Sequence, residues 1–412
     1  MTHFWQSDAG EHIRLHRRRT ASLRVTVKTE APTKKMRRGS QEKARQALRL
    51  AFEGDTLTSY ARKQTNWPKP RADIALEIFV NSGSRNGARI DSACKWLLDE
   101  LAGLVYRDDK QVKLLFARIG RPLNDPESLA FWGEDALPVT KVVEPPGASI
   151  SITAQPRSSV LHDLRAANSL EEAWDPHKAV YGESRRSPFY DDFERDVLLD
   201  YQTLFDPDDE EQGARFRQIA NQIDYRDQAR QQKHVDFVFS SLFTDLPVDR
   251  FGVWRAARSR LAHSPYIFDL GTIPERGESE EFQRRLRRIL EDRKHRFPGL
   301  LPLRARSGVS MILFEKPGHP KDLDNLVRQT LPTILDLLRP PRHDHHGWLA
   351  DEPELSASQV DIPFIEIAAI AADQSDMPPG SLVLGLSSAD RNSSWWSLVG
   401  DYVERSLDDA YP

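Results

Sequence analysis

An internal repeat constrains the fold of this chain more than any other sequence feature. Residues 72–106 and residues 307–338 each open with an apolar, β-prone run and continue through a short glycine-containing turn. Each segment then resumes at an aspartate that precedes apolar residues at helical spacing. These aspartates, Asp91 and Asp324, differ by 233 in number. A cation follows each of them by four residues.

A second pair of segments repeats at the same offset. Residues 144–159 resemble residues 377–394, and the Pro-Pro-Gly glycines of the two segments, Gly147 and Gly380, also differ by 233. Because two separate matches share one offset, the sequence predicts a tandem duplication.

Each copy is predicted to read strand, helix, strand, helix, strand, strand, a mixture that favours the α+β class. The expected strands include 22–32, 74–80, 112–119 and 144–159 in the first copy and 234–247, 309–314, 356–367 and 377–394 in the second, with helices at 40–54 and 278–297 and after Asp91 and Asp324. Two tandem α+β domains, each a mixed sheet packed with helices, are therefore expected, joined by a helical acidic linker. The predicted boundaries are 1–21 for a basic N-terminal tail, 22–159 for the first domain, 160–233 for the linker, 234–400 for the second domain and 401–412 for a C-terminal tail.

Composition excludes several classes of protein. The chain has one cysteine, Cys94, so it has no internal disulfide and no multi-cysteine zinc motif. It contains no apolar run near 18 residues and no glycine-rich phosphate loop, so neither a membrane span nor an ATP site is expected. These features indicate a cytoplasmic protein.

Charge is spread unevenly along the chain. Residues 1–72 contain 17 Lys and Arg against 6 Asp and Glu, which suits either a solvated tail or a flank that follows nucleic-acid phosphates. Residues 190–212 are strongly acidic. They form either a solvated helix and turn or a segment that repels or mimics nucleic acid, covers a basic surface, or recruits a protein partner.

Asp322 and Asp324 stand two residues apart where the second repeat begins its helix. In an extended segment such side chains face the same way, and oxygen ligands held together suit Mg²⁺ or Mn²⁺. Asp324 is alternatively a helix N-cap. Arg328, one turn beyond, either pairs with Asp324 or reaches a phosphate.

The first copy carries a second acidic pair. Asp108 and Asp109 lie in a predicted turn before the strand at 112–119. Two aspartates are common in turns for conformational reasons alone, but together with Asp91 and Lys95 they form a more specific pattern.

The stretch "IDSACKWLLDELAGLVYRDDKQV" resembles the core of the RusA family of Holliday-junction resolvases, and "KDLDNLVR" resembles the first part of the same pattern. That pattern is D-x-D-N-x-x-K, a helix, and D-D-x-Q-V leading into a strand. The resemblance implies small α+β domains that act as dimers and cut branched DNA with Mg²⁺. This chain would be a fused pseudo-dimer of two RusA-like domains.

Both copies depart from that pattern. Arg89 and Ser92 replace the leading aspartate and the asparagine in the first copy. In the second copy Arg328 replaces the lysine, and Ser356 and Ala357 align with the D-D turn. Three outcomes are open: one copy is rescued by a neighbouring acid, both copies bind DNA without cutting, or the two copies combine their acids in a composite site. The resemblance disfavours the composite, since it implies separate sites across the dimer.

The leading hypothesis is a metal-dependent, structure-specific DNA endonuclease, and the alternative is an inactive DNA-binding or scaffold protein that acts with a partner. The expected partner is branched DNA. A protein bound through the acidic linker and a second copy of the chain are further candidate partners, and no membrane is expected. The candidate catalytic residues are Asp91, Lys95, Asp109, Asp322, Asp324 and Arg328, and the candidate ligands for Mg²⁺ or Mn²⁺ are Asp91, Asp108, Asp109, Asp322, Asp324 and Asp344.

Overall fold

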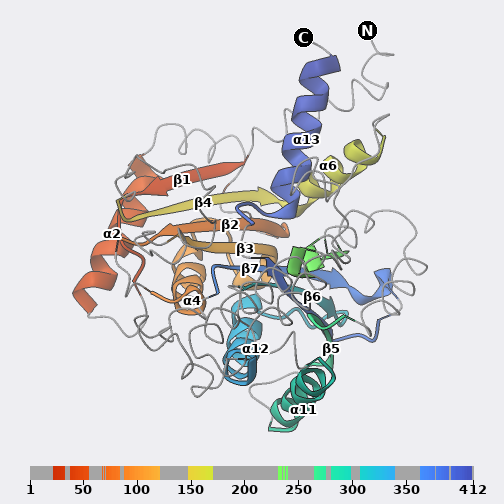
Figure 1. Ribbon diagram of the computed structural model, residues 1–412. Coiled ribbons are helices and arrows are strands. Elements are labelled where there is room, and N and C mark those ends of the chain that lie inside the picture. The colour runs from red at the N-terminus through yellow and green to blue at the C-terminus, as the bar shows by residue number, and fades with distance from the viewer. Residues whose placement is uncertain are drawn as a thin grey trace, which may run out of the picture.

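Figure 1 shows the fold of the protein as a computed structural model of residues 1–412. The structure describes residues 22–32, 38–54, 67, 69, 71–83, 88–120, 147–169, 231–233, 235–236, 238–239, 264–274, 280–297, 307–338, 362–375, 377–388 and 391–410. No helix within these ranges is long and apolar enough to cross a membrane.

One mixed sheet of eight strands lies at the centre, in the order β1-β4-β2-β3-β7-β6-β8-β5. The first half comprises β1 (Leu23–Val27), β2 (Ile74–Asn81), β3 (Val112–Gly120) and β4 (Ser149–Pro156). The second half comprises β5 (Ile267–Thr272), β6 (Ser307–Glu315), β7 (Phe364–Ala371) and β8 (Ser381–Ser388). Read from each outer edge of the sheet toward its centre, the order is β1-β4-β2-β3 in the first half and β5-β8-β6-β7 in the second. The two halves therefore have the same strand order, as the predicted duplication requires, and the mixture of strands and helices agrees with the α+β class.

The two halves meet where β3 pairs with β7. That pairing is antiparallel, with Phe116 opposite Glu366. Within each half the corresponding central strands run parallel, β2 with β3 and β6 with β7. The sheet is therefore continuous, and an approximate two-fold axis between β3 and β7 relates its halves.

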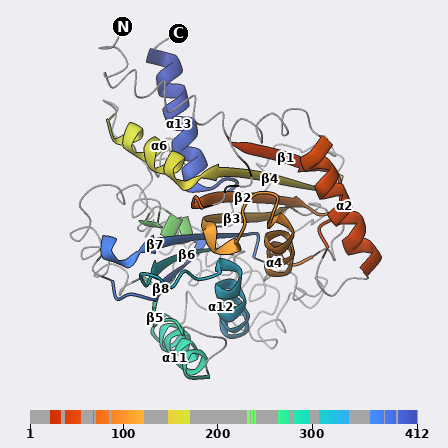
Figure 2. The ribbon, with the colours of Figure 1, turned by 180° about the vertical axis from the view of Figure 1, so that it is seen from behind.

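Four helices cover one face of the sheet (Figures 1 and 2). α4 (Ile90–Leu101) and α12 (Leu323–Leu338) contact each other at the centre, and their first residues keep the offset of 233. α2 (Arg38–Gly54) lies beyond α4, and its Arg45 donates two hydrogen bonds to the carboxylate of Glu100 on α4. α11 (Glu280–Arg296) packs on α12. Each central helix connects two parallel strands, the usual role of a crossover helix.

The opposite face is covered by α6 (Arg157–Ser169), α13 (Trp395–Ala410) and the helical residues 231–239 that the structure describes. Buried polar groups line this face. The Arg391 guanidinium donates to both carboxylate oxygens of Glu366 at 2.5 and 2.8 Å, and the hydroxyl of Ser397 donates to Glu77 at 2.7 Å. Burial raises the pKa of Glu77, against the opposing effect of the hydroxyls of Ser394 and Ser397. Trp395 and Trp396 are buried and meet edge to face, so they anchor α13 to the core.

Burial along the strands follows their place in the sheet. β1, at one edge, alternates buried and exposed residues, as expected where one face meets solvent. β6 and β7 near the centre are buried along almost their whole length, because helices cover both faces. Their apolar runs are typical of strands covered on both sides.

One predicted strand is wrong. Residues 234–247 were expected to open the second copy as a strand, but the described residues between 231 and 239 are helical and β5 supplies that strand. Val235, Val238 and Phe239 are buried at positions i, i+3 and i+4, which is helical rather than alternating spacing. Two helices also cross predicted boundaries: α6 begins at Arg157 and α13 continues to Ala410.

Candidate metal centre

The strand directions decide which acidic residues can meet. β6 runs antiparallel to β3, since β7 lies between them, antiparallel to β3 and parallel to β6. The end of β6 and the start of β3 therefore lie at the same edge of the sheet. Asp322 and Asp324 follow β6, while Asp108 and Asp109 precede β3, so the acids of one half approach those of the other.

Within a single half the corresponding acids are kept apart. β2 and β3 are parallel and α4 connects them, so Asp91 lies at the beginning of α4 and Asp108 follows its end. A helix of 12 residues is about 18 Å long at about 1.5 Å per residue. The topology thus opposes a site built from the first copy alone.

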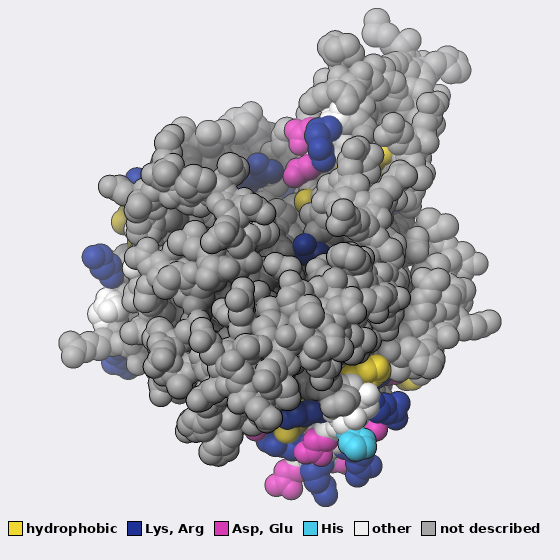
Figure 3. Space-filling model, viewed as in Figure 1, with side chains coloured by type: hydrophobic (Ala, Val, Ile, Leu, Met, Phe, Trp, Pro, Cys, Tyr) yellow, Lys and Arg dark blue, Asp and Glu magenta, His cyan; other side chains and the backbone are white. Residues whose placement is uncertain are grey.

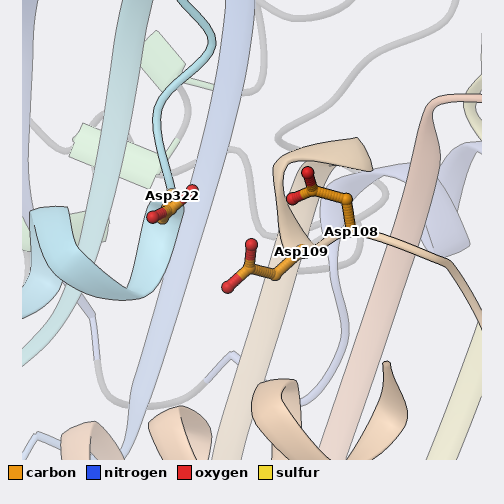
Figure 4. A group of neighbouring side chains, drawn as sticks. All are labelled: Asp108, Asp109 and Asp322. Atoms are coloured by element: carbon orange, nitrogen blue, oxygen red, sulfur yellow. The ribbon is translucent and has the colours of Figure 1, made fainter. Parts of the chain in front are cut away.

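Three carboxylates converge across the boundary between the halves. Asp108, Asp109 and Asp322 each offer one oxygen, and these oxygens all lie within 4.8 Å of one another (Figure 4). In the part of the chain that the structure describes, this is the one group of three His, Cys, Asp or Glu side chains with such spacing. Figure 4 shows the two aspartates of the first half facing Asp322 across the gap.

A short 3-10 turn, η2 (Asp109–Gln111), holds the first two carboxylates. Asp108 caps it, accepting a hydrogen bond from the backbone N–H of Lys110 at 3.0 Å, and this bond lowers the pKa of Asp108. Gln111 fixes the turn to the strand: its side-chain oxygen accepts from the backbone N–H of Arg107, and its amide donates to the carbonyl of Ala72. The predicted D-D turn is confirmed.

The beginning of α12 presents the other two carboxylates. Asp322 precedes the helix and accepts a hydrogen bond from the Asn325 side chain at 3.0 Å. Asp324 lies inside the first turn and is only 2% exposed. Its Oδ1 has no hydrogen-bond partner among the described residues, and its Oδ2 contacts the ammonium of Lys95 instead of a backbone N–H of the helix. The N-cap interpretation of Asp324 is therefore wrong, and so is the extended geometry expected of this pair.

Lys95 belongs to the first half but contacts the second. Its ammonium forms an ion pair with Asp324 and a second one with Asp99 at 3.2 Å. Burial disfavours the charge of Lys95, but the two carboxylates outweigh it and raise the pKa of Lys95. Lys95 therefore stays protonated beside the acidic cluster.

The cluster has an excess of negative charge that its own residues do not neutralise. Burial and the charge of Asp322, together with a hydrogen bond with Asp108 and the charge of Asp324, raise the pKa of Asp109 to about 6. One oxygen of Asp322 is also buried without a hydrogen-bond partner within the described ranges. Uncompensated, converging carboxylate oxygens are the arrangement that a hard divalent cation stabilises.

The remaining predicted residues lie elsewhere. The Asp91 carboxylate is 3.3 Å from the Arg89 side chain and is not part of the cluster. Arg328 is exposed on α12. Asp344, Ser356 and Ala357 fall outside the described residues.

The converging acids come from both halves of the chain, as the composite alternative supposes. The second half contributes Asp322, Asp324 and Asn325, and the first half contributes the D-D turn and Lys95. Residues of the two halves therefore meet at this position.

Sequence reasoning missed one ion pair beside the cluster. Lys113, at the start of β3, lies 2.8 Å from Glu315 at the end of β6, and both side chains are largely buried. The pair joins the two halves at the edge that carries the acids. No signal in the sequence indicates it, because the two residues belong to different copies and lie 202 residues apart.

Comparison with protein-family models, with curated proteins and with solved structures finds no match to this chain.

Proposed function

We propose that the protein is a metal-dependent endonuclease that hydrolyses a phosphodiester in branched DNA, as the resemblance to RusA resolvases implies. The observation that carries the proposal is the convergence of Asp108 and Asp109 with Asp322 across the two halves, beside the buried Asp324. Each of these residues lies in a segment that carries the resemblance, although Asp109 and Asp322 differ by 213 in number.

The residues present fit a divalent cation. Asp108, Asp109 and Asp322 would hold it, and Asp324 would add negative charge behind them. All four groups are carboxylates, the donors that Mg²⁺ and Mn²⁺ prefer. When bound, such an ion supplies positive charge that stabilises a phosphate in its transition state and makes water more acidic.

The protein's own residues supply the rest of the chemistry. Lys95 keeps its proton because of its two ion pairs, so its ammonium can donate a hydrogen bond to a phosphate oxygen. Asn325 holds Asp322 in position from the following helical turn. The η2 turn and the start of α12 are rigidly tied to strands, which preserves the spacing of the carboxylates.

DNA contacts are proposed for two basic segments. The cationic excess of residues 1–72 suits non-specific attraction to phosphates. Among the described elements, α11 presents exposed cations along its outer side, visible at the bottom of Figure 3, although acidic side chains lie among them. The exposed arginines of α11 are Arg284, Arg287, Arg288 and Arg296.

A matched pair of variants tests the proposal on a synthetic four-way DNA junction with Mg²⁺, Mn²⁺ or EDTA. Asp324→Asn and Asp91→Asn change the equivalent residue of the two halves, each in the first turn of its helix. We expect Asp324→Asn to abolish metal-dependent cleavage, as Asp109→Asn should, and Asp91→Asn to retain it. Junction binding is scored on the same samples.

Two results would contradict the proposal. Cleavage that persists in both Asp324→Asn and Asp109→Asn would show that another site cuts. Tight junction binding without cleavage in either metal would favour the inactive, DNA-binding alternative.

A further inference from the structure

The approximate two-fold axis defines a counterpart to the candidate metal centre. Its position is given by the offset of 233, which α4 and α12 keep in the structure. The counterparts of Asp322, Asp324, Asn325 and Lys95 are Arg89, Asp91, Ser92 and Arg328, respectively. β2 and β6 run in opposite directions, so α4 and α12 begin from opposite ends of the sheet and run past each other where Lys95 meets Asp324.

The charges at the two positions are opposite in character. The candidate centre gathers the carboxylates of Asp108, Asp109 and Asp322, and the ion pair of Lys95 with Asp324 lies beside them. At the counterpart, a guanidinium stands in place of Asp322, and its Nε lies 3.3 Å from Asp91. A second guanidinium, that of Arg328, replaces Lys95 and is exposed.

A guanidinium beside the single described carboxylate of the counterpart disfavours a divalent cation there, since like charges repel strongly at contact distance. Arginine instead suits a phosphate oxygen, which its planar fork binds with two hydrogen bonds. The counterpart is thus suited to hold a DNA backbone rather than to cut it.

We infer that the protein makes one incision per bound DNA junction, at the composite centre, and holds an uncut strand at the counterpart through Arg89 and Arg328. This inference rests on the proposed function. One water is consumed in each incision: its oxygen forms a bond to phosphorus, one ester P–O bond breaks, and the departing oxygen leaves with a proton. No oxidant or reductant is required.

The buried Asp324 distinguishes the candidate centre from an ordinary cluster of surface acids. It is 2% exposed, and its Oδ1 has no hydrogen-bond partner within the described ranges. The Oδ1 of Asp91 likewise has no hydrogen-bond partner within the described ranges, but Asp91 is more exposed, with 18% of its side chain accessible, and this oxygen lies 3.3 Å from the Arg89 Nε.

The experiment uses a supercoiled plasmid that extrudes a cruciform at an inverted repeat. A single incision releases the supercoiling, so the cruciform is reabsorbed and the plasmid remains an open circle. Paired incisions across the junction give linear DNA instead. We expect open circles to account for nearly all product, and linear DNA as the main early product would overturn the inference while leaving the proposed nuclease intact.

Two measurements without cleavage accompany this assay. Calorimetric titration with Mn²⁺ is expected to give one site per chain, lost in both Asp322→Asn and Asp109→Asn; two sites per chain would contradict the inference. Junction binding in EDTA is expected to weaken at least fivefold in Arg89→Ala/Arg328→Ala. The matched control is Arg165→Ala/Arg405→Ala, which removes two exposed arginines from α6 and α13 on the opposite face and should leave binding unchanged.

The outcomes separate the two proposals. Linear product with one Mn²⁺ site would support the proposed nuclease function and reject the inference of a single incision. Absence of any product in both metals rejects the nuclease and the single incision together. Unchanged binding in the double arginine variant would reject the role of Arg89 and Arg328 in holding DNA.

Discussion

Lys95 of the first half forms an ion pair with Asp324 of the second, at the contact between α4 and α12. Asp324 is buried, and the lysine is the cation that compensates its charge. The pair therefore couples the stability of the interface between the halves to the charge of the candidate metal centre.

Replacing Lys95 with methionine is expected to lower the free energy of unfolding of the metal-free protein by about 2–4 kcal/mol, because it leaves a buried carboxylate uncompensated. Mg²⁺ should recover part of this loss, since a cation in the cluster replaces the missing charge. Urea denaturation with and without Mg²⁺ measures both effects. Lys43→Met, at an exposed position of α2, is the control and should change stability by less than about 0.5 kcal/mol.

The pH dependence of metal binding should follow Asp109. Its pKa is raised from an ordinary value of 3.8 to about 6, so ionisation of this group destabilises the metal-free folded state. That destabilisation is absent below about pH 4 and complete above about pH 6. A bound cation must displace the proton, so the thermal stabilisation by Mn²⁺ should be large at pH 7.5 and small at pH 5. In Asp109→Asn the metal effect should be small at both pH values, and a large effect at pH 5 in the unaltered protein would argue against Asp109 as a ligand.

The repeat and most of its strands and helices follow from the sequence because each copy has clear local periodicity. β2 and α4 begin at Ile74 and Ile90, close to the predicted positions, and α12 begins at Leu323. The composite centre was harder to predict from the sequence, because the pairing of β3 with β7 joins two copies and neither copy alone indicates it. Only that antiparallel pairing places the residues after β6 beside those before β3.

The prediction of a strand at 234–247 was wrong for a different reason. Its valines and phenylalanines have high β-propensity, but three of them fall at helical spacing and pack against the sheet. Val235 and Phe239 pack against Gly385 of β8, and a Cβ on this glycine would lie 2.6 Å from each of them. Tertiary packing thus decided the conformation against intrinsic propensity, as it often does for short apolar runs.

Gly308 of β6 should not tolerate a side chain. A Cβ at this position would lie 2.0 Å from the ring of Phe364, which is fully buried on the neighbouring strand. Gly308→Ala is expected to cost about 1–3 kcal/mol through overpacking. Gly147→Ala is the matched control, because a Cβ there meets no atom within 4 Å. Equal unfolding midpoints for the two variants in urea would contradict the packing of β6 on β7.

The buried pair of Arg391 and Glu366 is expected to act as a unit. Arg391 also lies 3.7 Å from Asp236, and all three side chains are at most 1% exposed. Arg391→Met leaves two carboxylates buried without their cation, so it should cost about 3–5 kcal/mol. Adding Glu366→Gln to the Arg391→Met variant removes one of those charges, and the amide oxygen can still accept the hydrogen bond from the backbone N–H of Trp395. The double variant should therefore be more stable than Arg391→Met alone, by at least about 1 kcal/mol. Chemical denaturation of the four proteins of this cycle measures the coupling, and additive effects would mean that the two side chains do not share their burial cost.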